Sequence, residues 1–303
     1  MILVFGSINL DLIVPVPALP APGQTVLGEA LRTEPGGKGG NQAVAAARDG
    51  ARVAMAGAVG EDAFAEPALA TLRSAGVDLS RLAAVPVATG AAAICVDPEG
   101  RNQIAVAPGA NLSAKAAQVA DGDLGPRTTL VLQREVSRQE TEALIARARG
   151  LGARIILSLA PPEPLARAAL EAVDVLLLNE GEAAALAAML GTADGPAALR
   201  AALGRPSVIV TRGEKGAEAA TEEGSLHQPA FPITPRDTTA AGDTFAGVLA
   251  AALDRGASLR DAMRRAAAAA ALTCTRPGSQ GSIPDAAETD ALLARGVTAF
   301  TAP

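Results

Sequence analysis

The chain has 303 residues and a mass of 30.1 kDa, more than the about 100 to 200 residues of one ordinary core, which excludes a peptide or a fibre. Hydrophobic residues make up 49% and charged residues 19%, so the chain can bury a core and wholesale disorder is excluded. The net charge of −6 disfavours nucleic acid and anionic membranes as partners.

The N-terminal segment has no basic region of the kind an export signal carries, and no apolar run reaches the about 18 residues that cross a bilayer. Cys95 and Cys274 lie far apart outside any CxxC pair, and His227 is the only histidine, so a zinc site is not expected. We therefore expect a cytoplasmic protein that binds neither nucleic acid nor membrane, and we assign no role to these three residues.

Short apolar runs alternate with helical patterns along the chain. Such runs are typical of parallel strands that are covered on both faces. In chain order, the predicted strands are Ile2–Phe5, Val53–Ala56, Thr129–Leu132, Arg154–Leu157, Val173–Leu178 and Ser207–Val210. The predicted helices include Asn41–Asp49, Ala65–Ala75, Arg138–Arg149, Gly181–Leu190 and Phe245–Arg255. This alternation predicts an α/β fold with a doubly wound, mostly parallel sheet.

Two regions interrupt this rhythm. Leu10–Thr33 contains four prolines, and Val87–Ala107 contains two strand-like segments joined by an Asp-Pro-Glu-Gly turn. We expect these two regions to form a small sheet outside the main layers.

The strongest candidate for phosphate chemistry is Asp237–Gly247, because small residues lead there into an apolar helix. The free amides at a helix start bind anions, and Asp243 could accept a proton from a hydroxyl that attacks a bound phosphoryl group. The alternative is that Asp243 merely caps the helix. Neither GxxxxGK[ST] nor a GxGxxG after the first strand is present, which sets those two phosphate-binding motifs aside.

Polar residues elsewhere are also candidates. Gly36–Asn41 places Lys38, one of three lysines, among glycines that let backbone approach a ligand, although it could be a plain flexible turn. Asn179–Glu182 has the spacing of a capping box, and a role in holding metal near phosphates is the alternative. Further polar residues, each of which could be an ordinary surface residue, follow predicted strands at Asn9, Asp11 and Glu135.

In this order, these segments resemble the ribokinase branch of the ribokinase-like (PfkB) sugar kinase family over nearly the whole chain. The matching segments are Gly6–Asp11, Pro20–Thr25, Gly36–Ala47, Gly109–Asn111, Asn179–Glu182, Thr211–Gly213 and Asp237–Gly247. The resemblance implies one kinase domain over residues 1–303, a three-layer α/β/α sandwich with a β-sheet lid formed by insertions at about 10–33 and 87–107. It also implies Mg²⁺ with ATP, a monovalent cation that is usually K⁺, and a homodimer formed through the lid.

The resemblance implies a role for each matching residue. It implies Asp243 as the catalytic base, with an anion hole at Ala240, Ala241 and Gly242. It places the sugar against Asn9, Asp11, Gly37, Lys38, Asn41, Glu135 and Asp243. It places ATP against Asn179, Thr211, Gly213, Gly216 and Gly242. It assigns Mg²⁺ and its waters to Asn179 and Glu182, and K⁺ to Asp237, Thr239, Thr273, Gly278 and Ser282.

The expected reaction is transfer of the γ-phosphate of ATP to the 5-hydroxyl of D-ribose. Kinases of another pentose, of deoxyribose or of a nucleoside remain alternatives, as does a non-catalytic sugar-binding regulator. Ser158-Leu-Ala-Pro161 departs from the Asn-Pro-Ala-Pro of many ribokinases, and Ala91–Ala93 makes the lid rich in alanine. These departures bear on sugar preference more than on the class of reaction.

Overall fold

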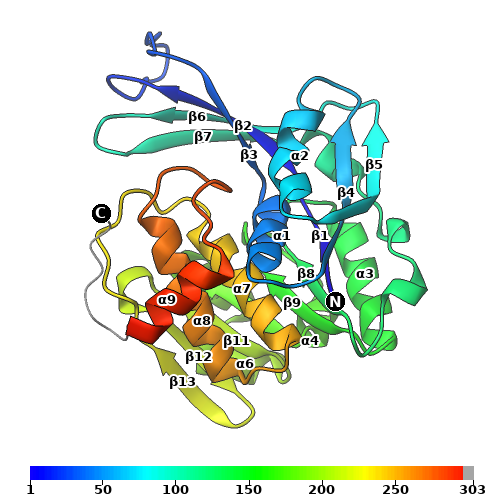
Figure 1. The fold of residues 1–303 in the computed structure, drawn as a ribbon. Helices are drawn as coiled ribbons and strands as arrows, with labels where there is room; N and C mark the ends of the chain where they lie inside the picture. The colour runs from blue at the N-terminus through cyan, green and yellow to red at the C-terminus, as the bar shows by residue number, and fades with distance from the viewer. Residues whose placement is uncertain (296–303) are drawn as a thin grey trace.

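A nine-stranded sheet forms the centre of the structure, a computed structural model that describes residues 1–295. Its strands are β1 (Ile2–Phe5), β4 (Val53–Gly60), β5 (Asp78–Val85), β8 (Thr129–Leu132), β9 (Arg154–Ser158), β10 (Val175–Asn179), β11 (Ser207–Thr211), β12 (Ala217–Thr221) and β13 (Gly224–Gln228). Their order is β13-β12-β11-β10-β9-β8-β1-β4-β5. The strands from β11 to β5 run parallel, and β12 and β13 form an antiparallel hairpin at one edge (Figure 1).

Helices cover both faces of this sheet (Figure 1). One face packs against α1 (Lys38–Arg48), α2 (Ala65–Ser74), α7 (Ala241–Asp254) and α8 (Leu259–Cys274), and α9 (Ala286–Arg295) packs on α8. The other face packs against α3 (Arg138–Gly150), α4 (Arg167–Ala172), α5 (Glu180–Leu190) and α6 (Pro196–Leu203). The predicted three-layer α/β/α sandwich is thereby confirmed.

Alternation along the strands builds the two apolar cores. In β1, Ile2 and Val4 face the α7 side, whereas Leu3 and Phe5 face the α3 side, and all four are fully buried. Each such side chain stabilises the fold by about 1.5–3 kcal/mol relative to its exposed state. Burial on both faces explains why these strands are continuous apolar runs in the sequence.

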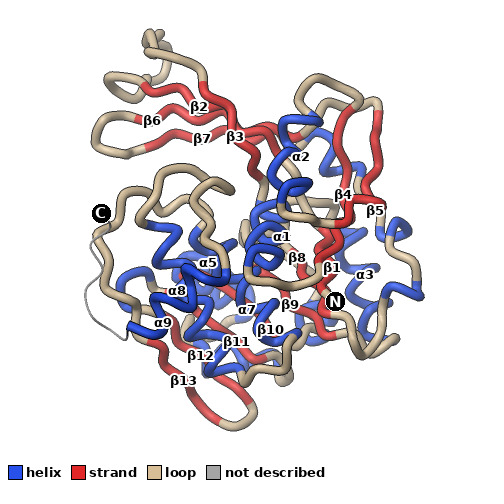
Figure 2. Tube along the Cα trace, viewed as in Figure 1, coloured by secondary structure: helices blue, strands red, loops and turns tan. Residues whose placement is uncertain are grey.

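The two interrupting regions form a second sheet, as expected. Its strands are β2 (Asn9–Pro15), β3 (Arg32–Gly36), β6 (Gly90–Val96) and β7 (Asn102–Ala107), in the order β3-β2-β6-β7. β6 and β7 are joined by the predicted turn, in which the Gly100 amide donates to the Asp97 carbonyl at 2.9 Å. This sheet projects beyond one end of the main body (Figure 2). The apolar side chains of Ile104 and Val106 on it are exposed.

Several elements differ from the sequence expectation. α1 begins at Lys38 rather than Asn41, and α7 begins at Ala241 rather than Phe245, because glycines in both first turns concealed the helix starts. β5, β12 and β13 were not predicted, since polar residues interrupt these strands, which lie at or next to the edges of the sheet. No described helix has the length and apolar character that a membrane span requires.

The close packing of α7 against α1 depends on Gly247. A Cβ atom on Gly247 of α7 would lie 2.4 Å from the carbonyl oxygen of Gln42 and 2.7 Å from the Cβ of Ala45, both in α1. Only glycine permits this approach. The close packing brings the first turn of α1 against the first turn of α7, beyond the carboxyl ends of the parallel strands, where ligands of open α/β sheets bind.

Candidate active site

The first turn of α7 holds the carboxylate that the sequence singled out. Ala240, just before the helix, has φ +60°, and it is the only non-glycine residue with positive φ among residues 1–295. Such a conformation costs about 1–2 kcal/mol for an alanine. The helix then begins at Ala241, whose amide donates to the Thr238 carbonyl at 3.3 Å, whereas the amides of Gly242 and Asp243 have no acceptor among residues 1–295. Together with the helix dipole, they form a site suited to an anion.

Asp243 is buried in this first turn, with 8% of its surface exposed. Asn41 Nδ2 donates to Asp243 Oδ2 at 3.0 Å, and Gln42 Nε2 donates to Oδ1 at 3.0 Å. Among residues 1–295, the side chain of Asp243 does not cap the start of α7, so the capping interpretation is not supported. Two amide donors instead fix the plane of this carboxylate.

The glycine-rich turn lies against the loop that follows β1. Gly37 has φ +82°, and a Cβ there would lie 2.8 Å from the amide nitrogen of Asn9. The amide of Lys38 donates to Glu135 Oε2 at 3.1 Å, and the Ser7 hydroxyl donates to the same oxygen at 2.6 Å. The turn therefore joins the ends of β1 and β8, two strands that are neighbours in the sheet.

The Lys38 ammonium group lies among carboxylates. The field of Asp243 raises its pKa above the ordinary value, with further contributions from Glu135 and Glu182 and an opposing one from burial. Lys38 therefore remains charged at neutral pH. Since the charges of these carboxylates act on Lys38, its ammonium group brings positive charge to the region of Asp243.

Asn9 and Asp11 point from β2 into the same region and are buried. Asn111 Nδ2 donates to Asn9 Oδ1 at 2.7 Å, and Asn111 Oδ1 accepts from the Ile8 amide at 2.8 Å. Asn41 Oδ1 is buried without a partner among the described residues. Because buried polar atoms are normally hydrogen-bonded, this free acceptor suits a ligand hydroxyl.

Burial raises the pKa of Asp11 to about 7, with the carboxylates of Glu135, Glu34 and Asp243 adding to the rise in that order. Asp11 is thus half-protonated near neutral pH, and it can both donate and accept a hydrogen bond. A sugar hydroxyl needs partners of both kinds.

Asn179 and Glu182 form a complete capping box at the start of α5. The Glu182 amide donates to Asn179 Oδ1 at 2.8 Å, and the Asn179 amide donates to Glu182 Oε2 at 2.8 Å. Burial raises the pKa of Glu182, whereas the hydrogen bond from Asn179 and the charge of Lys38 lower it. The capping role expected from the spacing is present, and, in addition to burial, the charge of Asp243 raises the pKa of Glu182.

The end of β11 continues into a tight turn. Gly213 and Gly216 have φ +54° and +90°, and a Cβ on Gly216 would lie 2.1 Å from the Gln228 carbonyl oxygen. The hydroxyl of Thr211 donates to the Leu178 carbonyl at 3.3 Å. β10 and β11 are adjacent, so Thr211 pairs in register with Asn179.

The segment before α7 and the loop after α8 meet through Asp237. Asp237 Oδ1 accepts from the amide and hydroxyl of Thr239 at 2.8 and 2.6 Å, and Oδ2 accepts from the Gly278 amide at 2.9 Å. Thr273 and Ser282 are fully buried, and their hydroxyls donate to nearby carbonyls. The structure thus joins Asp237, Thr239 and Gly278 directly, whereas no hydrogen bond links Thr273 or Ser282 to Asp237.

The site contains residues that the sequence analysis did not select: Ser7, Glu34, Gln42 and Asn111. Gln42 follows Asn41 directly, and Asn111 stands in one of the matching segments, so position along the chain was a usable signal for both. Nothing in the pattern marked Glu34, which reaches the site through its pairing with Asp11 across β2 and β3.

Comparison with known proteins agrees with this geometry. Residues 1–286 match the pfkB family carbohydrate kinase. Ribokinase of Bacillus subtilis is 35% identical over 294 residues, covering 96% of this chain and 99% of that protein. The ribokinase structure of Thermotoga maritima superposes with a TM-score of 0.89 at 32% identity, covering 97% of this chain and 99% of the other. Ribokinase of Arabidopsis thaliana, solved with ribose and ATP, gives a TM-score of 0.85 at 29% identity, covering 96% and 98%.

The family match spans both the parallel sheet and the four-stranded sheet, and it includes every segment that carries the candidate residues. This chain belongs to the pfkB family of carbohydrate kinases.

Proposed function

We propose that this protein is an ATP-dependent sugar kinase that transfers the γ-phosphate of ATP to the primary 5-hydroxyl of D-ribose, giving ribose 5-phosphate. The observation that carries the proposal is the Asp243 carboxylate at the open amino end of α7, fixed by Asn41 and Gln42 beside Lys38. A base, an anion site and a positive charge meet there. Phosphoryl transfer requires these three elements.

In this proposal, the oxygen of the sugar's 5-hydroxyl forms a bond to the γ-phosphorus, and Asp243 accepts the proton of that hydroxyl. The bond from that phosphorus to the bridging oxygen of ADP breaks, and ADP leaves. The backbone at Ala240, Ala241 and Gly242 stabilises the charge on the transferred group, because helix-start amides donate without reorganising. Lys38 balances the negative charge that gathers beside Asp243.

Sugar binding is assigned to a group of residues at the junction of the two sheets. Asn41 offers a free buried acceptor, and Asp11, with a pKa of about 7, can donate or accept. The backbone of Asn9 lies so close to Gly37 that no side chain would fit there. The full set is Asn9, Asp11, Gly37, Lys38, Asn41, Glu135 and Asp243.

The nucleotide is assigned to the neighbouring strand ends, at Asn179, Thr211, Gly213, Gly216 and Gly242. Mg²⁺ bound with ATP would neutralise phosphate charge. Oxygen ligands at Asn179 and the half-buried Glu182 fit this ion, which commonly keeps waters and phosphate oxygens as its other ligands. Glu182 would hold such waters through its carboxylate.

A monovalent cation, K⁺ in our proposal, is assigned to Asp237, Thr239, Thr273, Gly278 and Ser282. Carboxylate, hydroxyl and carbonyl oxygens suit such an ion. Asp237 supports the assignment, since it ties the segment before α7 to the loop after α8. A cation there would hold the Ala240 turn that precedes the anion site.

The four-stranded sheet is assigned as a lid that closes over the sugar and excludes water, which limits wasteful ATP hydrolysis. Its exposed apolar residues, which include Leu31, Ile104 and Val106, support pairing with a second copy of the chain. A homodimer through this sheet and a cytoplasmic location, where ATP is available, complete the proposal.

A coupled assay of ADP formation tests the substrate. D-ribose, 2-deoxyribose, other pentoses and nucleosides are compared by kcat/KM with Mg·ATP and potassium. We expect D-ribose to rank first. A higher value for deoxyribose or a nucleoside would move the protein to another acceptor of the family, and sugar binding without turnover on any acceptor would favour a non-catalytic regulator.

A further inference from the structure

A pocket lies at the amino ends of the central parallel strands, at the opposite end of the sheet from the candidate active site. Its volume is about 750 Å³, within the usual range for small-molecule sites. It is lined where β1, β8 and β9 begin and at the loops that precede β10 and β11. Leu253 and Asp254 at the carboxyl end of α7 complete it, whereas Asp243 lies at the amino end of the same helix.

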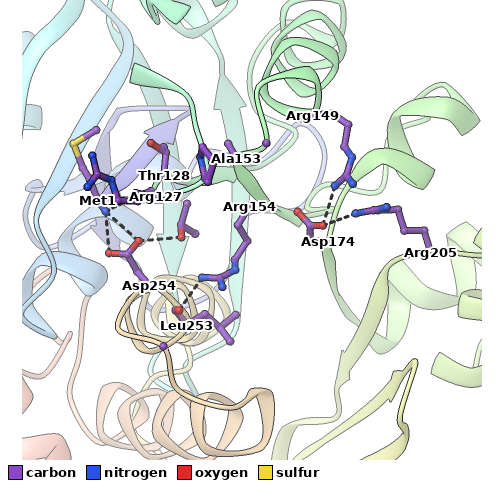
Figure 3. Close-up of a pocket in the computed structure, with 14 residues that line it drawn as sticks. Met1, Arg127, Thr128, Arg149, Ala153, Arg154, Asp174, Arg205, Leu253 and Asp254 are labelled. Atoms are coloured by element: carbon purple, nitrogen blue, oxygen red, sulfur yellow. Dashed lines mark hydrogen bonds and ion pairs between the residues drawn. The ribbon is translucent and has the colours of Figure 1, made fainter. Parts of the chain in front are cut away.

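The pocket is rich in arginine on a chain whose net charge is −6. Arg127, Arg149, Arg154 and Arg205 line it, against the carboxylates of Asp174 and Asp254 (Figure 3). The N-terminal ammonium group of Met1 forms an ion pair with Asp254, with 3.0 Å between the nitrogen and Oδ2. Positive charge therefore exceeds negative charge in the pocket.

The carboxylate of Asp174 does not satisfy the two arginines that converge on it. Arg149 Nη1 and Arg205 Nη2 donate to the same oxygen, Asp174 Oδ1, at 3.0 and 3.1 Å. The other Asp174 oxygen accepts from the amide of Ile155 at 2.8 Å. Since each guanidinium has five N–H donors, most donors of both arginines remain free for a ligand.

Within the described part of the chain, residues 1–295, the remaining two arginines have no carboxylate partner. Arg154 Nη1 donates to the Leu253 carbonyl at 2.7 Å, which offsets the partial negative charge at the end of α7. The guanidinium of Arg127 has no hydrogen bond or ion pair within residues 1–295. Figure 3 shows Arg127 beside Met1, across the pocket from Arg149 and Arg205. Guanidinium groups thus stand on two sides of one cavity.

We propose that this pocket binds a small organic anion with two or more phosphate or carboxylate groups, at a site separate from the active site. Guanidinium forks match phosphate and carboxylate oxygens in bidentate pairs. Placement on two sides of the cavity favours a ligand with more than one anionic group. Among residues 1–295, no aromatic residue lines the pocket, so none of them would stack on a nucleobase there. The ligand is therefore a polyanion without a base.

The test is calorimetric titration of the full chain with tripolyphosphate and, separately, with citrate, which distinguishes phosphate from carboxylate chemistry. We expect saturable binding of at least one of them, weakened by salt. Arg127→Ala should weaken it at least about tenfold, since the variant removes charge-assisted hydrogen bonds to the ligand. This variant removes a side chain without a partner, so folding should be unaffected.

The matched control is Arg73→Ala, which removes an exposed arginine of α2 that does not line the pocket. It should leave the affinity unchanged. The same pair of variants distinguishes binding in this pocket from binding at the amino end of α7, because that end lies about 20 Å away along a helix of 14 residues. Absence of binding by both anions, or equal affinity in the wild-type protein and Arg127→Ala, would overturn the proposal.

Discussion

Replacing Asp11 by asparagine should stabilise the unliganded protein in a pH-dependent way. Burial and three neighbouring carboxylates raise the pKa of Asp11 from 3.8 to about 7 in the folded chain. Between these values the folded protein holds a proton that the unfolded chain releases. The contribution of Asp11 to stability therefore falls as pH rises from about 4 to 7, and the full penalty of the ionised group is present above pH 7.

The size of the effect follows from the shift. A rise of about three pKa units corresponds to about 4 kcal/mol, of which about 3 kcal/mol develops between pH 5 and pH 8. The side chain is 8% exposed, so solvent screens this penalty only weakly. Asparagine has nearly the same shape and no charge, so the variant avoids the penalty.

Urea unfolding at pH 5 and pH 8 measures this difference. We expect the free energy of unfolding of Asp11→Asn, relative to that of the wild-type protein, to be about 3 kcal/mol higher at pH 8 than at pH 5. The kcat/KM of the variant for ribose should fall. An equal gain at both pH values, or no gain at pH 8, would refute the electrostatic origin assigned to Asp11. Asp261→Asn, at the exposed start of α8, is a control that should show no such pH dependence.

Three further predictions concern packing, charge and the cation. Gly247→Ala should destabilise the fold by about 1–3 kcal/mol and reduce turnover, because the added methyl group separates α7 from α1. Urea unfolding and kinetics measure these two effects. The control in both measurements is Gly150→Ala, whose Cβ would contact nothing within 4 Å. Lys38→Met should lower kcat by about a hundredfold in the ADP assay, and a normal kcat would remove Lys38 from the phosphoryl-transfer step. Replacing potassium by tetramethylammonium should lower kcat in the wild-type protein and not in Asp237→Ala; equal rates with both cations in the wild-type protein would contradict the cation site.

Much of the fold could be predicted because burial on both faces leaves a simple pattern. β1 and β8 appear in the sequence with the bounds that the structure has, since every residue in them is apolar or small enough to be buried. β5 mixes polar and apolar residues at one edge of the sheet, and β12 and β13 form the hairpin at the other, where β13 is the outermost strand. Polar residues break the apolar pattern in all three strands, so it did not reveal them.

The site was predictable where motifs have a fixed spacing and not where distant segments meet. Asp243 and the first turn of α7 follow from the Gly-Asp-Thr segment before an apolar helix. The shifted pKa of Asp11 depends on burial and on Glu135, Glu34 and Asp243, which three separate segments of the chain bring together. The arginine pocket likewise combines the starts of several strands, so no local stretch of sequence marked it.

The most direct test of the central claim is ribose-dependent ADP formation by the wild-type protein and by Asp243→Asn, together with ribose binding by calorimetry. Asn41 and Gln42 hold this carboxylate, and the variant keeps its shape but cannot accept the proton. We expect turnover in the wild-type protein, a loss of at least about a hundredfold in the variant and retained ribose binding. Unchanged turnover in Asp243→Asn would contradict it.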